Sequence, residues 1–123
     1  MKNYTVLFAI VLGGLFLLTS CKKEHKTKYV VLNETVKSGA MYSLDVASYG
    51  DADDRASITT QAAHYSVSQI DMDPATQKSI YHFSTETKVG GSEQVIITLS
   101  EDHGGRNRCD HNEAVITIKF SVQ

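Results

Sequence analysis

Apolar and polar residues alternate through much of the chain that follows residue 40. The runs EQVIITLS (93–100) and AVITIKFSV (114–122) are apolar at every second position, and IYHFS places Tyr81 and Phe83 together. A period of two residues, carried by β-branched and aromatic side chains, indicates strands with one buried face. No stretch after residue 21 keeps helical spacing over three turns. The pattern therefore predicts an all-β domain.

Clusters of Gly, Asp, Ser and Pro separate these runs and mark turns. Seven short strands in about 100 residues favour an antiparallel two-sheet Ig-like sandwich, with a small barrel as the alternative. The predicted strands are 28–36, 40–47, 56–60, 62–70, 79–85, 93–100 and 113–122.

The first 21 residues, MKNYTVLFAIVLGGLFLLTSC, have a different pattern. Lys2 precedes a 13-residue apolar run, Val6 to Leu18, which contains only Gly13 and Gly14 as weakly apolar positions. A membrane-spanning helix needs about 20 apolar residues, whereas the hydrophobic region of a secretory signal has about 7 to 15. The run therefore predicts a signal helix.

Leu18-Thr19-Ser20-Cys21 resembles the lipobox of bacterial lipoproteins. The resemblance implies that Cys21 is acylated through its sulfur, with two or three acyl chains such as palmitate, and becomes the new N-terminus. Two or more acyl chains anchor a protein stably to a membrane. The alternative is an ordinary signal followed by a chance cysteine.

The predicted organisation is a signal peptide (1–20), a lipidated tether (21–28) and one sandwich domain (29–123). The formal net charge of the chain is −2, which is too mild to suggest a nucleic-acid partner. With Cys21 used for the lipid, Cys109 has no intramolecular partner, so the domain must be held by its apolar core.

A second resemblance covers about residues 36 to 122. The segments YGDADDRASIT, HYSVSQIDMDPATQKSIYHF, GGSEQVIITLSEDHGG and AVITIKFSV follow the order of strands and turns in bacterial Ig-like and cadherin-like repeat domains. This resemblance implies a non-enzymatic binding or structural module. The chain departs from it by holding one copy and by the addition of RNRCDHNE at the tip of the final hairpin.

That hairpin tip is the first candidate site. If the strands around Leu99 and Ala114 pair, the segment between them lies at one end of the sandwich, and imidazole and thiolate ligands there suit zinc or copper. A solvated loop that meets a protein or glycan partner is the other interpretation. The metal candidates are His103, Cys109 and His111, and the partner-binding candidates are these three with Arg106 and Arg108.

The second candidate site is the acidic loop that holds Asp51, Asp53 and Asp54. Clustered carboxylates suit calcium, but Asp also favours ordinary turns. No cofactor is required by either interpretation.

Catalysis finds little support in the sequence. No Gly-x-Ser-x-Gly motif is present, and His64 and His82 lie opposite in phase to Tyr65 and Tyr81, so we expect both to face solvent. The sequence therefore predicts a lipoprotein of the bacterial envelope, periplasmic or surface-facing, that acts as a non-enzymatic binding or structural module. The alternative is a periplasmic transition-metal-binding protein that uses the 103–111 hairpin.

Overall fold

The computed structural model describes residues 26–51, 53–101 and 112–123. The predicted signal helix and most of the predicted tether lie outside these residues. The described elements are β1 (Lys28–Val36), β2 (Tyr42–Asp45), the 3-10 helix η1 (Val46–Tyr49), β3 (Asp54–Thr60), β4 (Val67–Met72), β5 (Ser79–Ser84), β6 (Gly91–Glu101) and β7 (Asn112–Val122).

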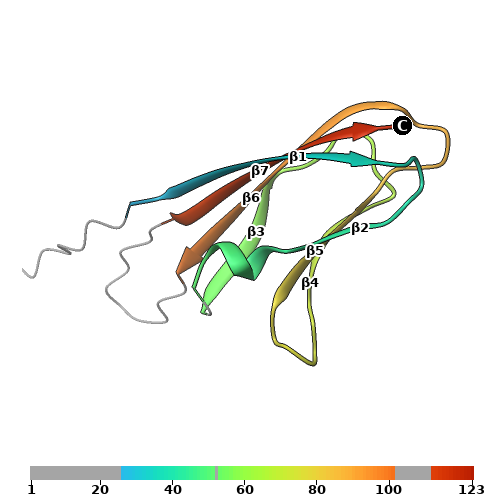
Figure 1. The fold of residues 1–123 in the computed structure, drawn as a ribbon. Helices are drawn as coiled ribbons and strands as arrows, with labels where there is room; N and C mark the ends of the chain where they lie inside the picture. The colour runs from blue at the N-terminus through green and yellow to red at the C-terminus, as the bar shows by residue number, and fades with distance from the viewer. Residues whose placement is uncertain (1–25, 52, 102–111) are drawn as a thin grey trace, which may run out of the picture.

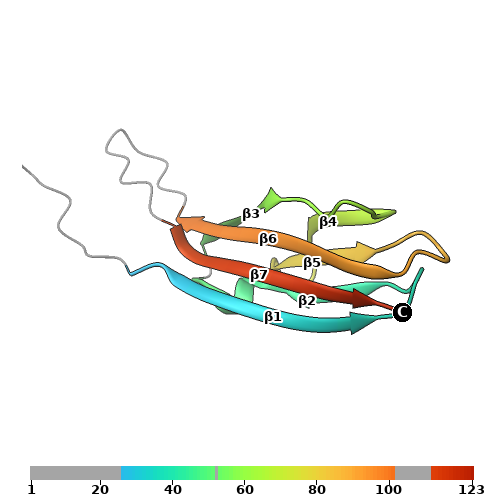
Figure 2. The ribbon, with the colours of Figure 1, turned by 90° about the horizontal axis from the view of Figure 1, so that it is seen from above.

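The strands form two sheets that pack face to face (Figure 1). One sheet has the order β1-β7-β6-β3 and the other the order β2-β5-β4. Figure 2 shows the four-stranded sheet from above, with β1 and β3 at its edges. The predicted all-β two-sheet sandwich of seven strands is confirmed.

The core lies between the sheets and is filled by the alternating apolar residues of β5, β6 and β7. Phe83 from the three-stranded sheet stacks on Phe120 from the four-stranded sheet, with 4.1 Å between the ring centroids. The rings of Tyr42 and Phe120 meet edge to face at 5.1 Å. These aromatic contacts join the two layers. The nine largest fully buried side chains are those of Tyr81, Phe83, Phe120, Ile97, Leu99, Ile116, Ile118, Val46 and Val95.

The sandwich differs from the prediction in one strand pair. β1 pairs with β7 in parallel, from Lys28 opposite Ala114 to Val36 opposite Val122, whereas an antiparallel sandwich was predicted. The reason is that the chain passes from β1 to the other sheet instead of forming a hairpin. Gly39 makes this crossing possible, since it has φ +76° and an added Cβ would lie 2.9 Å from Thr87 Cγ2.

The second predicted strand, 40–47, is shorter than expected. β2 ends at Asp45, and Val46 begins the single turn of η1. Val46 is fully buried. The chain bends at η1 and brings this side chain into the core, whereas the predicted longer strand would have continued along the sheet.

The fourth predicted strand, 62–70, begins only at Val67. Tyr65 falls within the predicted strand, but it precedes β4 and is 43% exposed. The residues before β4 bond instead to the carboxylate of Glu93 on β6. Its Oε2 accepts the N–H of Ala63 at 2.8 Å, and its Oε1 lies 2.7 Å from Nδ1 of His64. The side chains of both His64 and His82 lie on the outside, 72% and 31% exposed.

The Glu93 carboxylate predicts a pH dependence of stability. Burial raises its pKa, but the hydrogen bonds from the His64 side chain and from the N–H groups of Ala63 and His64 lower it more, so the pKa lies below its usual 4.5. A carboxylate whose pKa is lowered by folding stabilises the folded state at pH values above its unfolded-state pKa. This stabilisation is lost as the pH falls through the folded-state pKa.

We therefore expect Glu93→Gln to reduce the free energy of unfolding by about 1–3 kcal/mol at neutral pH. The difference from wild type should shrink as the pH falls below about 4.5. Urea titrations at several pH values measure both. Glu86→Gln, at an exposed carboxylate, is the control, and an equal effect of the two substitutions would disprove the role of Glu93.

Within the described residues, no helix has the length and apolar character needed to cross a bilayer.

Candidate functional site

The β2–β3 segment (46–51 and 53) and the β4–β5 turn (73–78) lie at the same end of the sandwich, which we call the loop end. β6 ends and β7 begins at this end. The registers place them together, because Asp54 lies opposite Glu101, and Asp45 lies opposite Ile80 beside the start of β5. The β6–β7 hairpin that the sequence predicted is confirmed.

The N-terminal strand enters the domain at this same end. Lys28, the first residue of β1, pairs with Ala114 near the start of β7, and β1 then runs to the far end of the sandwich (Figure 1). Any tether that precedes Lys28 is thus attached next to the loops. This arrangement follows from the parallel β1–β7 pair and was not expected from the sequence.

The β2–β3 segment is fixed by Asp54. Its Oδ2 accepts the N–H of Asp51 at 2.7 Å and lies so close to Gly50 that a Cβ on that residue would be 2.2 Å away. Its Oδ1 is buried and has no hydrogen-bond partner among the residues that the structure describes. Burial raises the pKa of Asp54, and the neighbouring carboxylates of Asp51, Asp53 and Glu101 raise it further, against the lowering effect of the Asp51 N–H.

The β4–β5 turn is held by its own side chains. Asp73 accepts hydrogen bonds from the N–H of Ala75 and the hydroxyl of Thr76, both at 2.9 Å, and these bonds lower its pKa. Lys78, the last residue of the turn, lies with its Nζ 2.9 Å from Oδ2 of Asp45 at the end of β2. The turn is therefore a pre-ordered part of the loop end.

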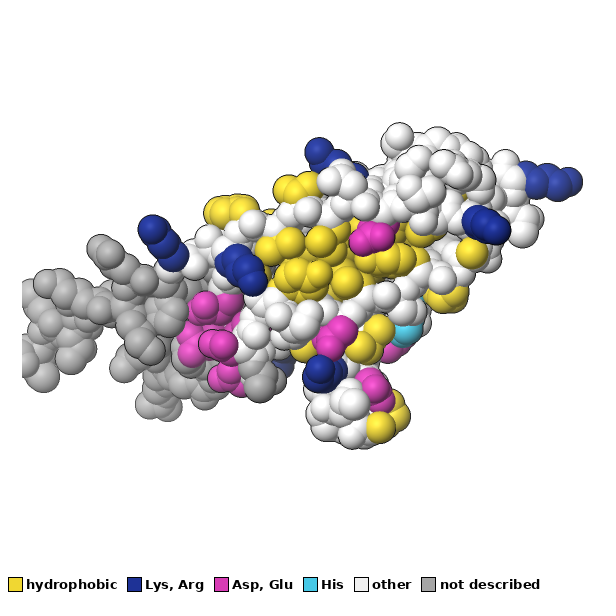
Figure 3. All heavy atoms as spheres, in the orientation of Figure 1, with side chains coloured by type: hydrophobic (Ala, Val, Ile, Leu, Met, Phe, Trp, Pro, Cys, Tyr) yellow, Lys and Arg dark blue, Asp and Glu magenta, His cyan; other side chains and the backbone are white. Residues whose placement is uncertain are grey.

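A cleft of about 380 Å³ lies between the first residues of β3 and the last residues of β4, and the β2–β3 segment and the β4–β5 turn border it. Figure 3 shows acidic side chains gathered at the loop end, on the face that carries β1 and β2. Charged and apolar side chains both line the cleft. Its lining residues are Ala47, Asp53, Asp54, Arg55, Ala56, Ile70, Asp71, Met72, Gln77 and Ser79.

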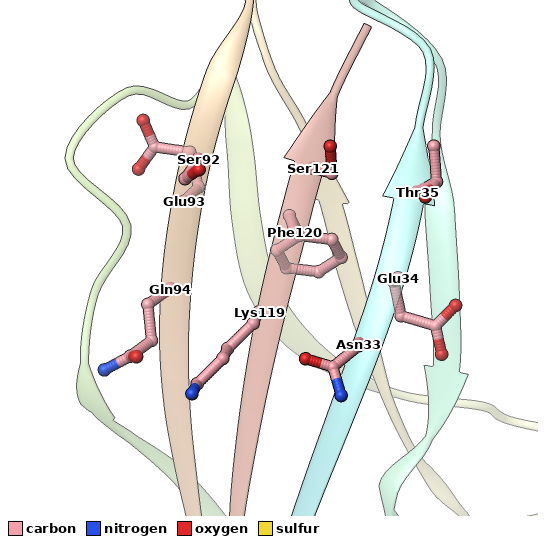
Figure 4. A pocket seen from close by; sticks show the side chains of 9 residues that line it. All are labelled: Asn33, Glu34, Thr35, Ser92, Glu93, Gln94, Lys119, Phe120 and Ser121. Carbon is pink, nitrogen blue, oxygen red and sulfur yellow. The ribbon is translucent and has the colours of Figure 1, made fainter.

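A second hollow, of about 500 Å³, lies on the outer face of the four-stranded sheet toward the far end (Figure 4). The side chains of Asn33, Lys119 and Gln94 cross it in one row from β1 to β6. This surface is open and polar, and it contains no residue that the sequence singled out.

Of the predicted site residues, the structure describes those of the acidic loop. Asp51 and Asp53 are exposed and Asp54 is half-buried, and within 26–51, 53–101 and 112–123 no three His, Cys, Asp or Glu residues are grouped so as to hold a metal ion. The calcium hypothesis for Asp51, Asp53 and Asp54 stays a prediction. Cys21, His103, Arg106, Arg108, Cys109 and His111 lie outside the described residues.

The β4 side of the loop end was not expected from the sequence. Met72, 61% exposed, and Ile70 line the cleft, yet neither was a candidate. The signal available was the turn sequence DMDP, which places an apolar residue immediately before a tight turn.

No protein-family model matches the chain, and no curated protein matches it significantly. Among solved structures, PbICP-C in complex with falcipain-2 is similar with a TM-score of 0.52 and 8% identity, over 80% of this chain and 92% of that one. The cysteine protease inhibitor EhICP2 from Entamoeba histolytica gives a TM-score of 0.44 at 10% identity, over 79% of this chain and 97% of that one. At such low identity, the likeness to PbICP-C describes the fold alone.

Proposed function

We propose that this protein is a lipid-anchored lipoprotein of the bacterial envelope, whose Ig-like sandwich is a non-enzymatic module that binds a protein partner with its loop end. The observation that carries the proposal is the entry of β1 at the loop end, seven residues after the candidate lipidation site Cys21.

The anchor is supported by the order of features in the leader. A positive residue, a short apolar run and Leu18-Thr19-Ser20-Cys21 follow one another as in bacterial lipoproteins. The basic residues of KKEHKTK, just after Cys21, add attraction to anionic head groups of about 1 kcal/mol each near the surface.

The length of the tether limits where the loop end can act. An extended chain spans at most about 3.3–3.6 Å per residue, so the residues between Cys21 and Lys28 reach about 25 Å at most. The loop end therefore works close to the membrane surface, and the far end of the sandwich projects away from it. A partner that is itself held at the envelope fits this geometry.

The character of the cleft supports a protein partner. Arg and Met are enriched in the cores of protein interfaces, and Arg55 and Met72 lie in the cleft wall among apolar and acidic groups. PbICP-C, which shares the fold, was solved in complex with the protein falcipain-2. A sandwich of this shape is thus compatible with binding another protein.

Site-specific photo-crosslinking in whole envelopes tests this proposal. A photoreactive residue at Asp53, in the cleft wall, should give a discrete protein adduct several-fold more strongly than one at Glu86. Both positions are exposed carboxylates, and Glu86 belongs to the far end. Equal yields, an adduct from Glu86 alone, or an adduct with glycan alone would contradict a protein-binding loop end.

The transition-metal hypothesis for His103, Cys109 and His111 stays a prediction, because those residues lie outside the described ones.

A further inference from the structure

β1 is a long edge strand. It bonds to β7 on one side, and the sheet order leaves no strand on its other side within the described residues. Its sequence, KYVVLNETV, contains no proline or glycine over nine residues. Exposed strand edges of this kind pair readily with another extended chain unless something protects them.

The free edge borders an opening between the two sheets. Figure 3 looks into this opening, between β1 and β2, and shows an apolar patch there. Leu32 on β1 and Tyr42 and Leu44 on β2 are partly buried hydrophobic residues that pack on the core. Glu34 lies on the same inward face of β1 and accepts a hydrogen bond from the Tyr42 hydroxyl.

Lys28 also lies on the inward face, because its Nζ sits 5.8 Å from the centroid of the Tyr49 ring. The outward face of β1 carries Tyr29 and Val31, which are 77% and 57% exposed. Both faces of β1 therefore carry apolar side chains, and along the free edge no described strand lies beside them.

The sequence of β1 is complementary to itself about Val31. In an antiparallel pair centred on that residue, Lys28 lies opposite Glu34, Tyr29 opposite Asn33, and Val30 opposite Leu32. Opposite charges placed directly across strands are favourable and like charges are unfavourable. A register centred on Leu32 would place Val30 against Glu34 and leave Lys28 against Val36, so charge favours Val31 over Leu32 as the centre.

We propose that β1 pairs with β1 of a second copy of this chain, antiparallel and centred on Val31, to form a two-fold dimer with one continuous eight-stranded sheet. The contact is isologous, so each ion pair between Lys28 and Glu34 forms twice. The contact uses the backbone N–H and C=O groups on the free edge of β1, so the loop ends of both copies stay accessible. The proposal does not depend on the lipid anchor, although confinement to a membrane raises the effective concentration of the copies.

Cysteine cross-linking of the full chain in membranes tests the register. Facing residues of an antiparallel pair have Cα atoms about 4.5–5.5 Å apart, which is within disulfide range. In a Cys109→Ser background, Val31→Cys should give a disulfide-linked dimer. Asn33→Cys on the same outward face should not, because the two copies of residue 33 would be separated by about 13 Å along the strand. Cys21 is common to both variants.

Charge reversal tests the partner. Lys28→Glu or Glu34→Lys alone, each combined with Val31→Cys, should lower the dimer yield about tenfold, because two like-charge pairs replace two ion pairs. Mixing differently tagged Lys28→Glu and Glu34→Lys chains should restore it, because both contacts are then again between Lys and Glu. The mixture also shows that both variants fold.

Three results would overturn the proposal. They are equal cross-linking from positions 31 and 33, no effect of the charge reversals, and a link from position 31 to a different protein or to none.

Discussion

Cys21→Ser is expected to abolish incorporation of a labelled fatty acid into the protein. The thioether that carries the lipid needs the cysteine sulfur, and the hydroxyl of serine does not replace it. Since two or more acyl chains hold a protein stably at a membrane, the whole of the lipid-dependent attachment should be lost with this one atom. Metabolic labelling followed by isolation of the protein measures the effect.

Cys109→Ser is the matched control, because Cys21 and Cys109 are the two cysteines of the chain. It should keep the full label. Equal labelling of wild type and Cys21→Ser would refute acylation at this residue, and loss of label in Cys109→Ser alone would move the lipid to the other cysteine.

Phe83→Ala is expected to reduce the free energy of unfolding by about 3–5 kcal/mol. Phe83 is fully buried and stacks on Phe120 across the two sheets, so truncation leaves a cavity at the contact that joins the layers. Domains of this size are stable by about 5–15 kcal/mol in total. The loss should therefore be visible as a large shift of the urea midpoint, followed by far-ultraviolet circular dichroism because the chain has no Trp.

Met41→Ala provides the comparison for this substitution. Met41 is a large apolar residue that is 58% exposed, and changes at such positions stay within about 0.5 kcal/mol. A cost below 1 kcal/mol for Phe83→Ala, or similar costs for both variants, would contradict the aromatic contact as a main support of the sandwich.

Alternation predicted the strands well where one face is buried and the other is solvated. Residues 93–100 and 113–122 were expected as a hairpin, and β6 and β7 pair as expected. Tyr81 and Phe83 were placed on one face, and both are fully buried. In these runs the geometry of a strand and the packing of the core both require an apolar residue at every second position.

The alternation of apolar and polar residues predicted the structure less well where the chain is held by side-chain contacts and not by strand pairing. Glu93 provides the partners of residues 63 and 64, and its role depends on a contact between positions about 30 residues apart. Val46 satisfies the alternation of a strand, but it is buried through a 3-10 turn. Local periodicity does not contain either of these long-range contacts.

The candidate site was predictable only in part for a related reason. The hairpin between β6 and β7 was enough to predict that one end of the sandwich carries the candidate site. The entry of β1 at that same end does not, because a parallel pair between the first and last strands leaves no mark on either strand's own sequence. The cleft beside Met72 also depends on which turns meet in space.

The most direct test of a lipid-anchored sandwich is the intact mass of the protein isolated from its own membrane. A lipid-anchored sandwich predicts a chain whose N-terminal residue is Cys21 and which carries the added mass of two or three acyl chains. A chain that begins at Met1, or one that is cleaved elsewhere and carries no lipid, would contradict it.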